Sequence, residues 1–417
     1  MMSPVPIPAA GGTPPRRRFR APAAAASALA AAAAMLTGCG APAPASAQSA
    51  GCAPAPSALA IVVAVHADAA PGIPAEAGCL VNAALEADAP ISVVAEDGAP
   101  YAVLTRHAYG IVPGSDTHDG DLDKARTDLI RTVTTAAART DGDNALAALA
   151  LAGQLTARTD GATAGPAWSP AVVVVSPGLP DTGKLDLTVA SMATAPAGEV
   201  ADAVTAAKAV PALPGTRVLW AGLGQAAGAQ QPLPAAQAGN YQAIWEAVLA
   251  KAGAAAQIIP GPVSGAGTPN SAGHAIRPVP PIAQAPVDLP RAGGTAVYPN
   301  TSALGFRPDS TDLRDPAAAA TAAAALAAWL TADPHRTLTV TGTTADTGTP
   351  QAQHDLALAR AQAIAALITA RGPDPARITT AGAGHDFPGY TPDHSPDGTL
   401  DPARAEANRT VRITLTP

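Results

Sequence analysis

Four short segments near the C-terminus decide the fold of that part of the chain. They are GTTADTG at residues 342–348, LALARA at 356–361, GAG at 382–384 with Pro388 four residues later, and NRTVRI at 408–413. The first segment follows TLTV at 337–340, whose alternation of polar and apolar residues is typical of a strand with one buried face. The segments therefore predict a strand, a loop, a helix, a second loop and a final strand in that order.

The residues around these segments predict two helices and the last strand. Asp315-Pro316 is typical of a helix start, with an N-cap and proline at the first helical position, and Asp333-Pro334 is typical of a helix end. Apolar side chains mark one face of each helix and of the strand; they are Leu326, Trp329 and Leu330, then Leu356, Ile364, Leu367 and Ile368, then Val411, Ile413 and Leu415. We expect the order β-α-β-α-β-β, a two-layer α+β sandwich over residues 296–417.

In register, the four segments resemble the OmpA-like peptidoglycan-binding domain, whose pattern runs GHTDxxG, LSxxRA, GxGxxxP and NRRVxI. The resemblance covers somewhat under a third of the chain. It implies a ligand, the diaminopimelate side chain of the peptidoglycan stem peptide, which carries an ammonium and a carboxylate on one carbon.

The resemblance also implies which residues bind that ligand. Arg360 stands at the family's ligand arginine, whose planar fork suits a carboxylate, with a surface salt bridge as the alternative role. The family's aspartate aligns with Ala345, so Asp346, one residue later, is the carboxylate expected to meet the ammonium. The complete implied set is Asp309, Thr344, Asp346, Arg360, Asn408 and Arg409.

The N-terminus has the pattern of an export signal. Four arginines lie within residues 16–20, a weakly apolar stretch covers 21–35, and LTGC at 36–39 resembles the bacterial lipobox. That resemblance implies a signal peptide over 1–38, acylation of Cys39 and a Pro- and Ala-rich tether over 39–57. An ordinary signal peptide is the alternative, and RRRF at 16–19 leaves the twin-arginine route open.

Two further cysteines, Cys52 and Cys79, remain if Cys39 carries lipid. Outside the cytoplasm such a pair favours a disulfide, and two buried thiols are the alternative. With a net charge of −7 and no basic stripe after the first twenty residues, we expect no nucleic-acid partner.

Residues 58–260 alternate apolar runs with helical patterns. Continuous apolar runs are typical of strands buried on both faces; they lie at 59–65, 91–95, 171–175, 217–221 and 257–259. Helical patterns lie between them at 121–139, 144–158, 198–210 and 241–252. This order predicts an α/β domain with a mostly parallel sheet.

The order of strands and helices in this region, and the residues in the loops between them, resemble a von Willebrand factor type A domain. In that family, oxygen ligands that follow the first strand and a central strand hold a divalent metal. The matching segments here are HADAA at 66–70, GDN at 142–144 and SPG at 176–178. Pro177 stands in place of a carboxylate ligand, so we expect no metal at this site, no cofactor and a protein partner.

Residues 261–295 are rich in Pro, Gly and Ala and predict a semi-extended linker.

DHSPDGTLD at 393–401 follows the order of a calcium loop, but Arg404 replaces the bidentate glutamate, which favours a solvated acidic turn. His66, His107 and His118 lie apart from any nucleophile motif, so we expect no enzyme.

The sequence thus predicts a non-enzymatic envelope lipoprotein, outside the cytoplasm and lipid-anchored at Cys39, whose C-terminal domain binds peptidoglycan and tethers the membrane to the wall. The alternative is an adhesion or assembly scaffold, in which the α/β domain binds a protein and the C-terminal domain no longer binds the wall.

Overall fold

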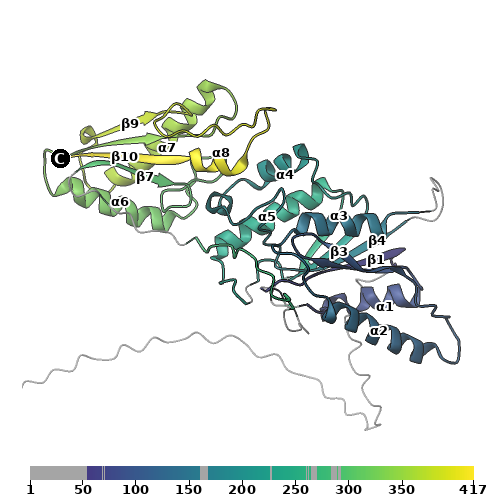
Figure 1. Cartoon of the computed structure of the whole chain (residues 1–417). Helices are drawn as coiled ribbons and strands as arrows, with labels where there is room; N and C mark the ends of the chain where they lie inside the picture. Colours follow the sequence, from purple (N-terminus) through teal and green to yellow (C-terminus); the bar gives the residue numbers. More distant parts are fainter. Residues whose placement is uncertain are drawn as a thin grey trace, which may run out of the picture. The chain divides into compact units, whose positions relative to one another are not determined.

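The structure is a computed structural model, and its described residues form two β-sheets with their helices (Figure 1). The described residues are 54–67, 69, 71–159, 168–225, 228–259, 261, 263, 270–282, 289 and 293–417. The predicted signal peptide, with Cys39, and most of the predicted tether, with Cys52, lie outside them. None of the helices described is long and apolar enough to cross a membrane.

The first sheet has six strands in the order β3-β2-β1-β4-β5-β6. Its strands are β1 (Ala58–Ala64), β2 (Ile91–Glu96), β3 (Tyr101–His107), β4 (Pro170–Val175), β5 (Arg217–Ala221) and β6 (Ala255–Ile259). All neighbours pair in parallel except β2 and β3, which are antiparallel. The sheet is therefore mostly parallel, in agreement with the α/β pattern of the sequence.

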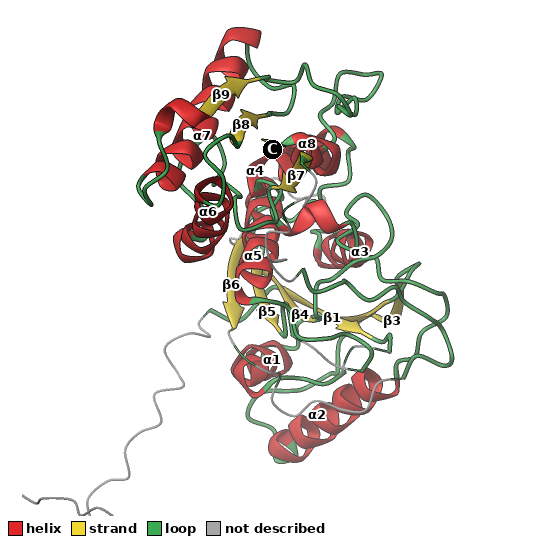
Figure 2. Ribbon diagram, turned by 90° about the vertical axis from the view of Figure 1, so that its left-hand side faces the viewer, coloured by secondary structure: helices red, strands yellow, loops and turns green. Residues whose placement is uncertain are grey.

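Helices cover both faces of this sheet, which explains why β1, β2 and β4 are buried along their whole length (Figure 2). Leu59 and Ile61 of β1 belong to one apolar core with α1 (Gly78–Glu86) and α2 (His118–Thr135). Ala60 and Val62, pointing to the opposite face, belong to a second core. That core includes residues of α3 (Ala145–Thr156), α4 (Ala197–Ala206) and α5 (Ala235–Lys251).

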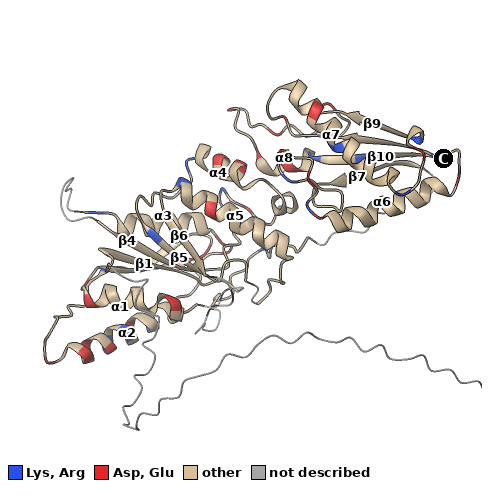
Figure 3. Ribbon diagram, turned by 180° about the vertical axis from the view of Figure 1, so that it is seen from behind, with Lys and Arg blue, Asp and Glu red and all other residues tan. Residues whose placement is uncertain are grey.

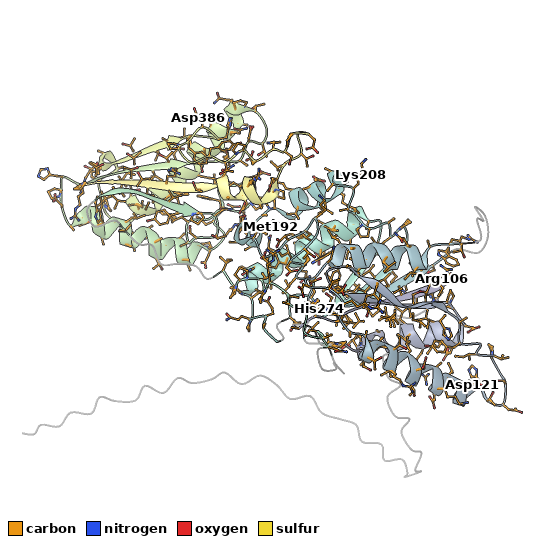
Figure 4. All side chains as sticks on the ribbon, in the orientation of Figure 1. Arg106, Asp121, Met192, Lys208, His274 and Asp386 are labelled. Atoms are coloured by element: carbon orange, nitrogen blue, oxygen red, sulfur yellow. The ribbon has the colours of Figure 1, made fainter. Side chains whose placement is uncertain are left out.

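Two elements of this part, α1 and β3, have no counterpart in the sequence-based expectation. β3 is an edge strand with alternating half-buried and exposed residues, so it lacks the continuous apolar run that marks its neighbours. Arg106 of β3, labelled in Figure 4, donates hydrogen bonds to the carbonyl oxygens of Leu155 and Ala157, at 2.8 and 2.9 Å. These contacts satisfy carbonyls at the C-terminal end of α3.

The second sheet has four strands in the order β7-β10-β8-β9. Its strands are β7 (Gly294–Pro299), β8 (Thr337–Gly342), β9 (Ile378–Gly382) and β10 (Thr410–Thr416). β10 pairs antiparallel with β7 and β8, while β8 and β9 are parallel. Side chains from one face of this sheet share a core with α6 (Pro316–Thr331) and α7 (Pro350–Thr369), as expected for a two-layer α+β sandwich.

The starts of both long helices follow from their caps. The Asp315 carboxylate accepts from the backbone N–H groups of Ala317 and Ala318, and Thr349 accepts from Ala352. Proline follows each cap at the first helical position. A short helix that the sequence pattern does not reveal, α8 (Pro402–Asn408), precedes β10 and is capped in the same way by Asp401.

Two glycines of the motif segments allow α7 to lie close to the sheet. A Cβ on Gly342 would lie 2.1 Å from the Ala357 carbonyl oxygen, and one on Gly382 would lie 2.4 Å from the His354 carbonyl oxygen. No side chain can occupy either position without moving the helix. Glycine is therefore required at these two positions because α7 packs so close to the sheet, and not because the backbone there adopts an unusual conformation.

Residues 270–282 form no helix or strand, as their Pro- and Gly-rich composition indicates, yet they pack on the α/β part. Val279 is buried, and the backbone N–H of Gly142 donates to the Ala275 carbonyl at 2.8 Å. This stretch of the expected linker is held by polar contacts that composition does not show. Three 3₁₀ turns complete the described elements: Ala75–Ala77, Ala190–Ala193 and Pro375–Arg377.

Candidate functional site

Arg360 of α7 is buried and its guanidinium meets the loop before α6. Its Nε donates to the Ser310 carbonyl at 2.9 Å and its Nη2 to the Arg307 carbonyl at 3.2 Å. The guanidinium lies 5.3 Å from the ring centre of Phe306. Burial and, next, the neighbouring Arg409 lower the pKa of Arg360 to about 10, so the group is cationic at neutral pH.

Asp309 lies in this same loop with a positive φ of 45°, a backbone conformation that aspartate tolerates better than most residues. The turn brings the carbonyls on either side of it to Arg360. The family resemblance implies that the Asp309 loop contacts the ligand, and in the structure this loop contacts Arg360, the arginine implied to bind the same ligand.

Arg409 is the second buried arginine of this group. It donates to the Glu406 carboxylate at 3.1 Å and to the Glu199 carboxylate at 2.6 Å. The pKa of Arg409 stands above its ordinary value, because the two carboxylates outweigh the effect of burial. Figure 3 shows Lys and Arg in blue and Asp and Glu in red on the described part of the chain.

Glu406 is a residue that sequence reasoning missed. It is buried on α8, accepts a hydrogen bond from the Asn300 amide at 2.7 Å and lies 3.5 Å from the Arg314 guanidinium. Burial raises its pKa, and Arg409 is the largest opposing influence. The only sequence feature that could have indicated Glu406 as a site residue is its position two residues before Asn408, because α8 was not predicted.

Arg360 and Arg409 line one small cavity together with Thr343, Asn300 and Phe306. Its volume is about 10 Å³, the space of about one water molecule. A ligand headgroup therefore enters only if the surrounding loops move.

Asp346 contacts other residues than these two arginines. Its carboxylate is half exposed, accepts from the Gln353 amide at 3.0 Å and lies 3.7 Å from Nδ1 of His385. Across the described part of the chain, no hydrogen bond or ion pair joins Asp346 to Arg360 or Arg409. Ala345, where the family has its aspartate, is fully buried. The predicted ligand set thus divides into two contact groups.

Asn408 is buried and uses its whole side chain within the fold. Its amide nitrogen donates to the Thr391 carbonyl and the Asp393 carboxylate, and its amide oxygen accepts from the Thr391 N–H. Thr344 is also buried, and its hydroxyl has no hydrogen-bond partner among the described residues. Asn408 therefore positions the 391–393 segment, whereas the role of Thr344 at a ligand stays a prediction.

The segment that follows the order of a calcium loop uses its acidic side chains locally. Asp401 caps α8, Asp397 accepts from the N–H of Thr399, and Asp393 accepts from the Tyr390 hydroxyl at 2.8 Å. Asp346, Asp393 and His394 do offer three atoms within 4.8 Å of one another. The Asp393 oxygens, however, are already hydrogen-bonded, and Asp393 is buried rather than solvated as predicted for this turn. Asp386, labelled in Figure 4, lies in the loop after β9.

Of the cysteines, Cys79 lies in α1 and is disulfide-bonded. Cys52 lies outside the described residues, so the pairing of Cys52 with Cys79 stays a prediction.

Residues 305–397 match the sequence model of the OmpA family, so an OmpA family domain lies in the C-terminal part of this chain. The resemblance drawn from the four motif segments is confirmed. No curated protein is similar enough to the chain to count as a match. The resemblance of the α/β part to von Willebrand factor type A domains stays a prediction.

Solved structures similar to the chain include the periplasmic domain of Helicobacter pylori MotB, with 18% identity over 31% of this chain and 86% of that one, at a TM-score of 0.25. The peptidoglycan-associated lipoprotein from Burkholderia pseudomallei has 19% identity over 30% and 90%, at 0.23. The OmpA-like domain of FopA1 from Francisella tularensis has 22% identity over 31% and 78%, also at 0.23.

Proposed function

We propose that the OmpA family domain at residues 305–397 binds peptidoglycan, and that the protein acts without catalysis in the cell envelope. The single observation that carries the proposal is the family match, with a buried, cationic arginine at its ligand-arginine position. The proposed ligand is the diaminopimelate side chain of the stem peptide.

Arg360 is proposed to bind the ligand carboxylate. Its guanidinium is held by two carbonyls of the loop around Asp309, so a carboxylate that displaces one of them gains a charge-assisted pair. The cavity at Arg360 is small, so binding requires a shift of the Asp309 loop. Asp346 is half exposed and is proposed to meet the ligand ammonium from the 342–348 loop.

The test is cosedimentation of the full-length protein with purified diaminopimelate-type sacculi. Arg360→Lys retains the positive charge but loses the planar fork, and Asp346→Asn removes the proposed partner of the ammonium. We expect each change to weaken binding at least about tenfold, because each removes one charge-assisted contact of the ligand.

Two exposed residues of the same region provide matched controls. Asp355→Asn changes an exposed carboxylate on α7, and Arg371→Lys changes an exposed arginine just after that helix. Both should bind sacculi like the parent protein. Equal loss in all four variants would indicate a general effect on the fold rather than the loss of a specific ligand contact, and no binding by the parent protein would exclude the wall-binding function.

The second candidate function is an adhesion or assembly scaffold that no longer binds the wall. It is favoured by one observation: both buried arginines already have partners, Arg360 in loop carbonyls and Arg409 in two carboxylates. Under this alternative the parent protein fails to sediment with sacculi, but a specific protein is recovered by cross-linking through the α/β part.

Anchoring and the role of the α/β part complete the proposal. Cys39 is proposed to carry lipid, which makes the wall-binding domain a tether between membrane and wall. Loss of membrane association in Cys39→Ser, measured by detergent phase partition, tests this anchoring.

The strand order β3-β2-β1-β4-β5-β6 is compatible with a von Willebrand factor A-like, protein-binding domain, although doubly wound dinucleotide-binding sheets share this order.

A further inference from the structure

Three buried ionisable side chains meet at the carboxyl-end edge of the six-stranded sheet. His66 lies two residues after β1, Glu96 is the last residue of β2, and Asp143 lies just before α3. All three are at most 2% exposed, and one ligand atom from each lies within 4.8 Å of the others. Nε2 of His66 is 3.4 Å from Asp143 Oδ2 and 3.8 Å from Glu96 Oε1.

The place of the cluster in the topology matches a ligand site. β1 pairs with β2 on one side and with β4 on the other, so the strand order reverses there. In open sheets of this kind, ligands bind beyond the carboxyl ends of the strands at that reversal.

Three of the four oxygens of the two carboxylates lack the hydrogen bonds that such burial requires. Oε2 of Glu96 and both carboxylate oxygens of Asp143 have no hydrogen-bond partner among the described residues. A buried carboxylate without compensation is costly, whereas a cation between the two would offset both charges.

Neighbouring groups hold the Glu96 carboxylate and the backbone of Asp143 in place. The Ser176 hydroxyl, just after β4, donates to Glu96 Oε1 at 2.5 Å and itself accepts from the Gly178 N–H at 2.9 Å. The backbone N–H of Asp143 donates to the Asp181 carboxylate at 2.7 Å. These contacts orient the ligand atoms from outside, as partners in a second coordination sphere do.

We propose that His66, Glu96 and Asp143 bind one divalent transition-metal ion of the Zn²⁺ type. Ligand bonds of about 2.0–2.2 Å in a tetrahedron place donor atoms roughly 3.4 Å apart, close to the two distances observed. One imidazole nitrogen and two carboxylate oxygens suit Zn²⁺ better than Ca²⁺ or Mg²⁺, which need six or more oxygens.

This set differs from the oxygen site implied by the von Willebrand factor A resemblance. Pro177 removes a ligand of that site, and the absence of metal was expected on that ground. Glu96 of β2 supplies a carboxylate that no motif indicated. The ion would tie the ends of β1 and β2 to the start of α3, a structural role in keeping with its burial.

The test is metal binding by the full-length protein after EDTA treatment and dialysis. With Co²⁺ as the probe, we expect one ion per chain, visible absorption and displacement by Zn²⁺. Glu96→Gln and Asp143→Asn should weaken Co²⁺ binding at least about 100-fold, because losing a ligand costs more than losing a second-sphere partner.

Asp141→Asn is the matched control. This carboxylate lies two residues away and pairs with His274, labelled in Figure 4, at 3.0 Å on the surface, so its loss should leave Co²⁺ binding unchanged. The proposal is overturned if the parent protein binds no Co²⁺, or if Asp143→Asn binds as tightly as Asp141→Asn.

A measurement on the parent protein alone decides the matter if both ligand variants fail to fold. Zn²⁺ at saturating concentration should raise the melting temperature of the EDTA-treated protein, because an ion that binds only the native state stabilises it. An unchanged melting temperature would overturn the proposal and leave His66 as the partner of the two carboxylates.

Discussion

The backbone N–H of Asp346 donates a hydrogen bond to the Asp393 carboxylate, with 3.0 Å between nitrogen and Oδ2. The same carboxylate accepts from the Asn408 amide and the Tyr390 hydroxyl. One buried side chain thus connects the 342–348 loop, the loop after β9 and the end of α8. The proposed ligand residue Asp346 owes its position to this contact.

Asp393 should make stability depend on acid pH. Burial alone would raise its pKa, but the hydrogen bonds from Asp346, Asn408 and Tyr390 lower it more, so the folded pKa lies below the unfolded one. Its contribution is complete above the unfolded pKa of about 4 and is lost as the pH falls through the folded pKa. Urea unfolding between pH 7 and pH 2.5 measures this.

Asp393→Asn should lower the free energy of unfolding at pH 7 by about 1.5–3 kcal/mol and flatten its acid dependence. Asp355→Asn, at an exposed position on α7, should change neither quantity appreciably. An unchanged stability of Asp393→Asn would contradict the role assigned to this carboxylate.

Gly342→Ala should destabilise the C-terminal part by several kcal/mol. The added Cβ would lie 2.1 Å from the Ala357 carbonyl oxygen, so α7 must move away from β8. Gly239→Ala in α5 is the control, since its Cβ meets nothing within 4 Å and alanine favours a helix. Chemical unfolding compares the two, and equal effects would refute the close-packing explanation.

Glu406→Gln should lower the free energy of unfolding by about 3–5 kcal/mol, because it removes the buried carboxylate that compensates Arg409 and Arg314. Glu246→Gln, at an exposed site on α5, should have little effect. If Glu406→Gln proved as stable as the parent, the carboxyl group would have to be neutral in the native state.

The predicted disulfide can be tested on intact protein. Thiol labelling without reductant should leave Cys52 and Cys79 unmodified. Cys79→Ser should lower the free energy of unfolding by about 3 kcal/mol, because without the crosslink the unfolded chain has more conformational entropy. Cys39→Ser should not affect this stability. Labelling of Cys52 in the native parent protein would exclude the pair.

The sequence alone was sufficient wherever neighbouring residues carry the signal. Apolar runs predicted β1, β2, β4 and β5, and the Asp315-Pro316 cap predicted the start of α6. The Gly-containing segments indicated the OmpA family domain, because their spacing reflects local turns and close helix packing. The edge strand β3 lacked such a signal, since its side chains are half-buried or exposed and none is fully buried.

Tertiary structure decided which charged groups meet. The family resemblance implies that Asp346 and Arg360 bind one ligand, yet Asp346 contacts Gln353 and Asp393, and Arg360 contacts the loop around Asp309. His66, Glu96 and Asp143 come from three separate segments and meet only because parallel strands end at one edge of the sheet. Local sequence determines the elements, whereas contacts between distant side chains depend on the packing of those elements.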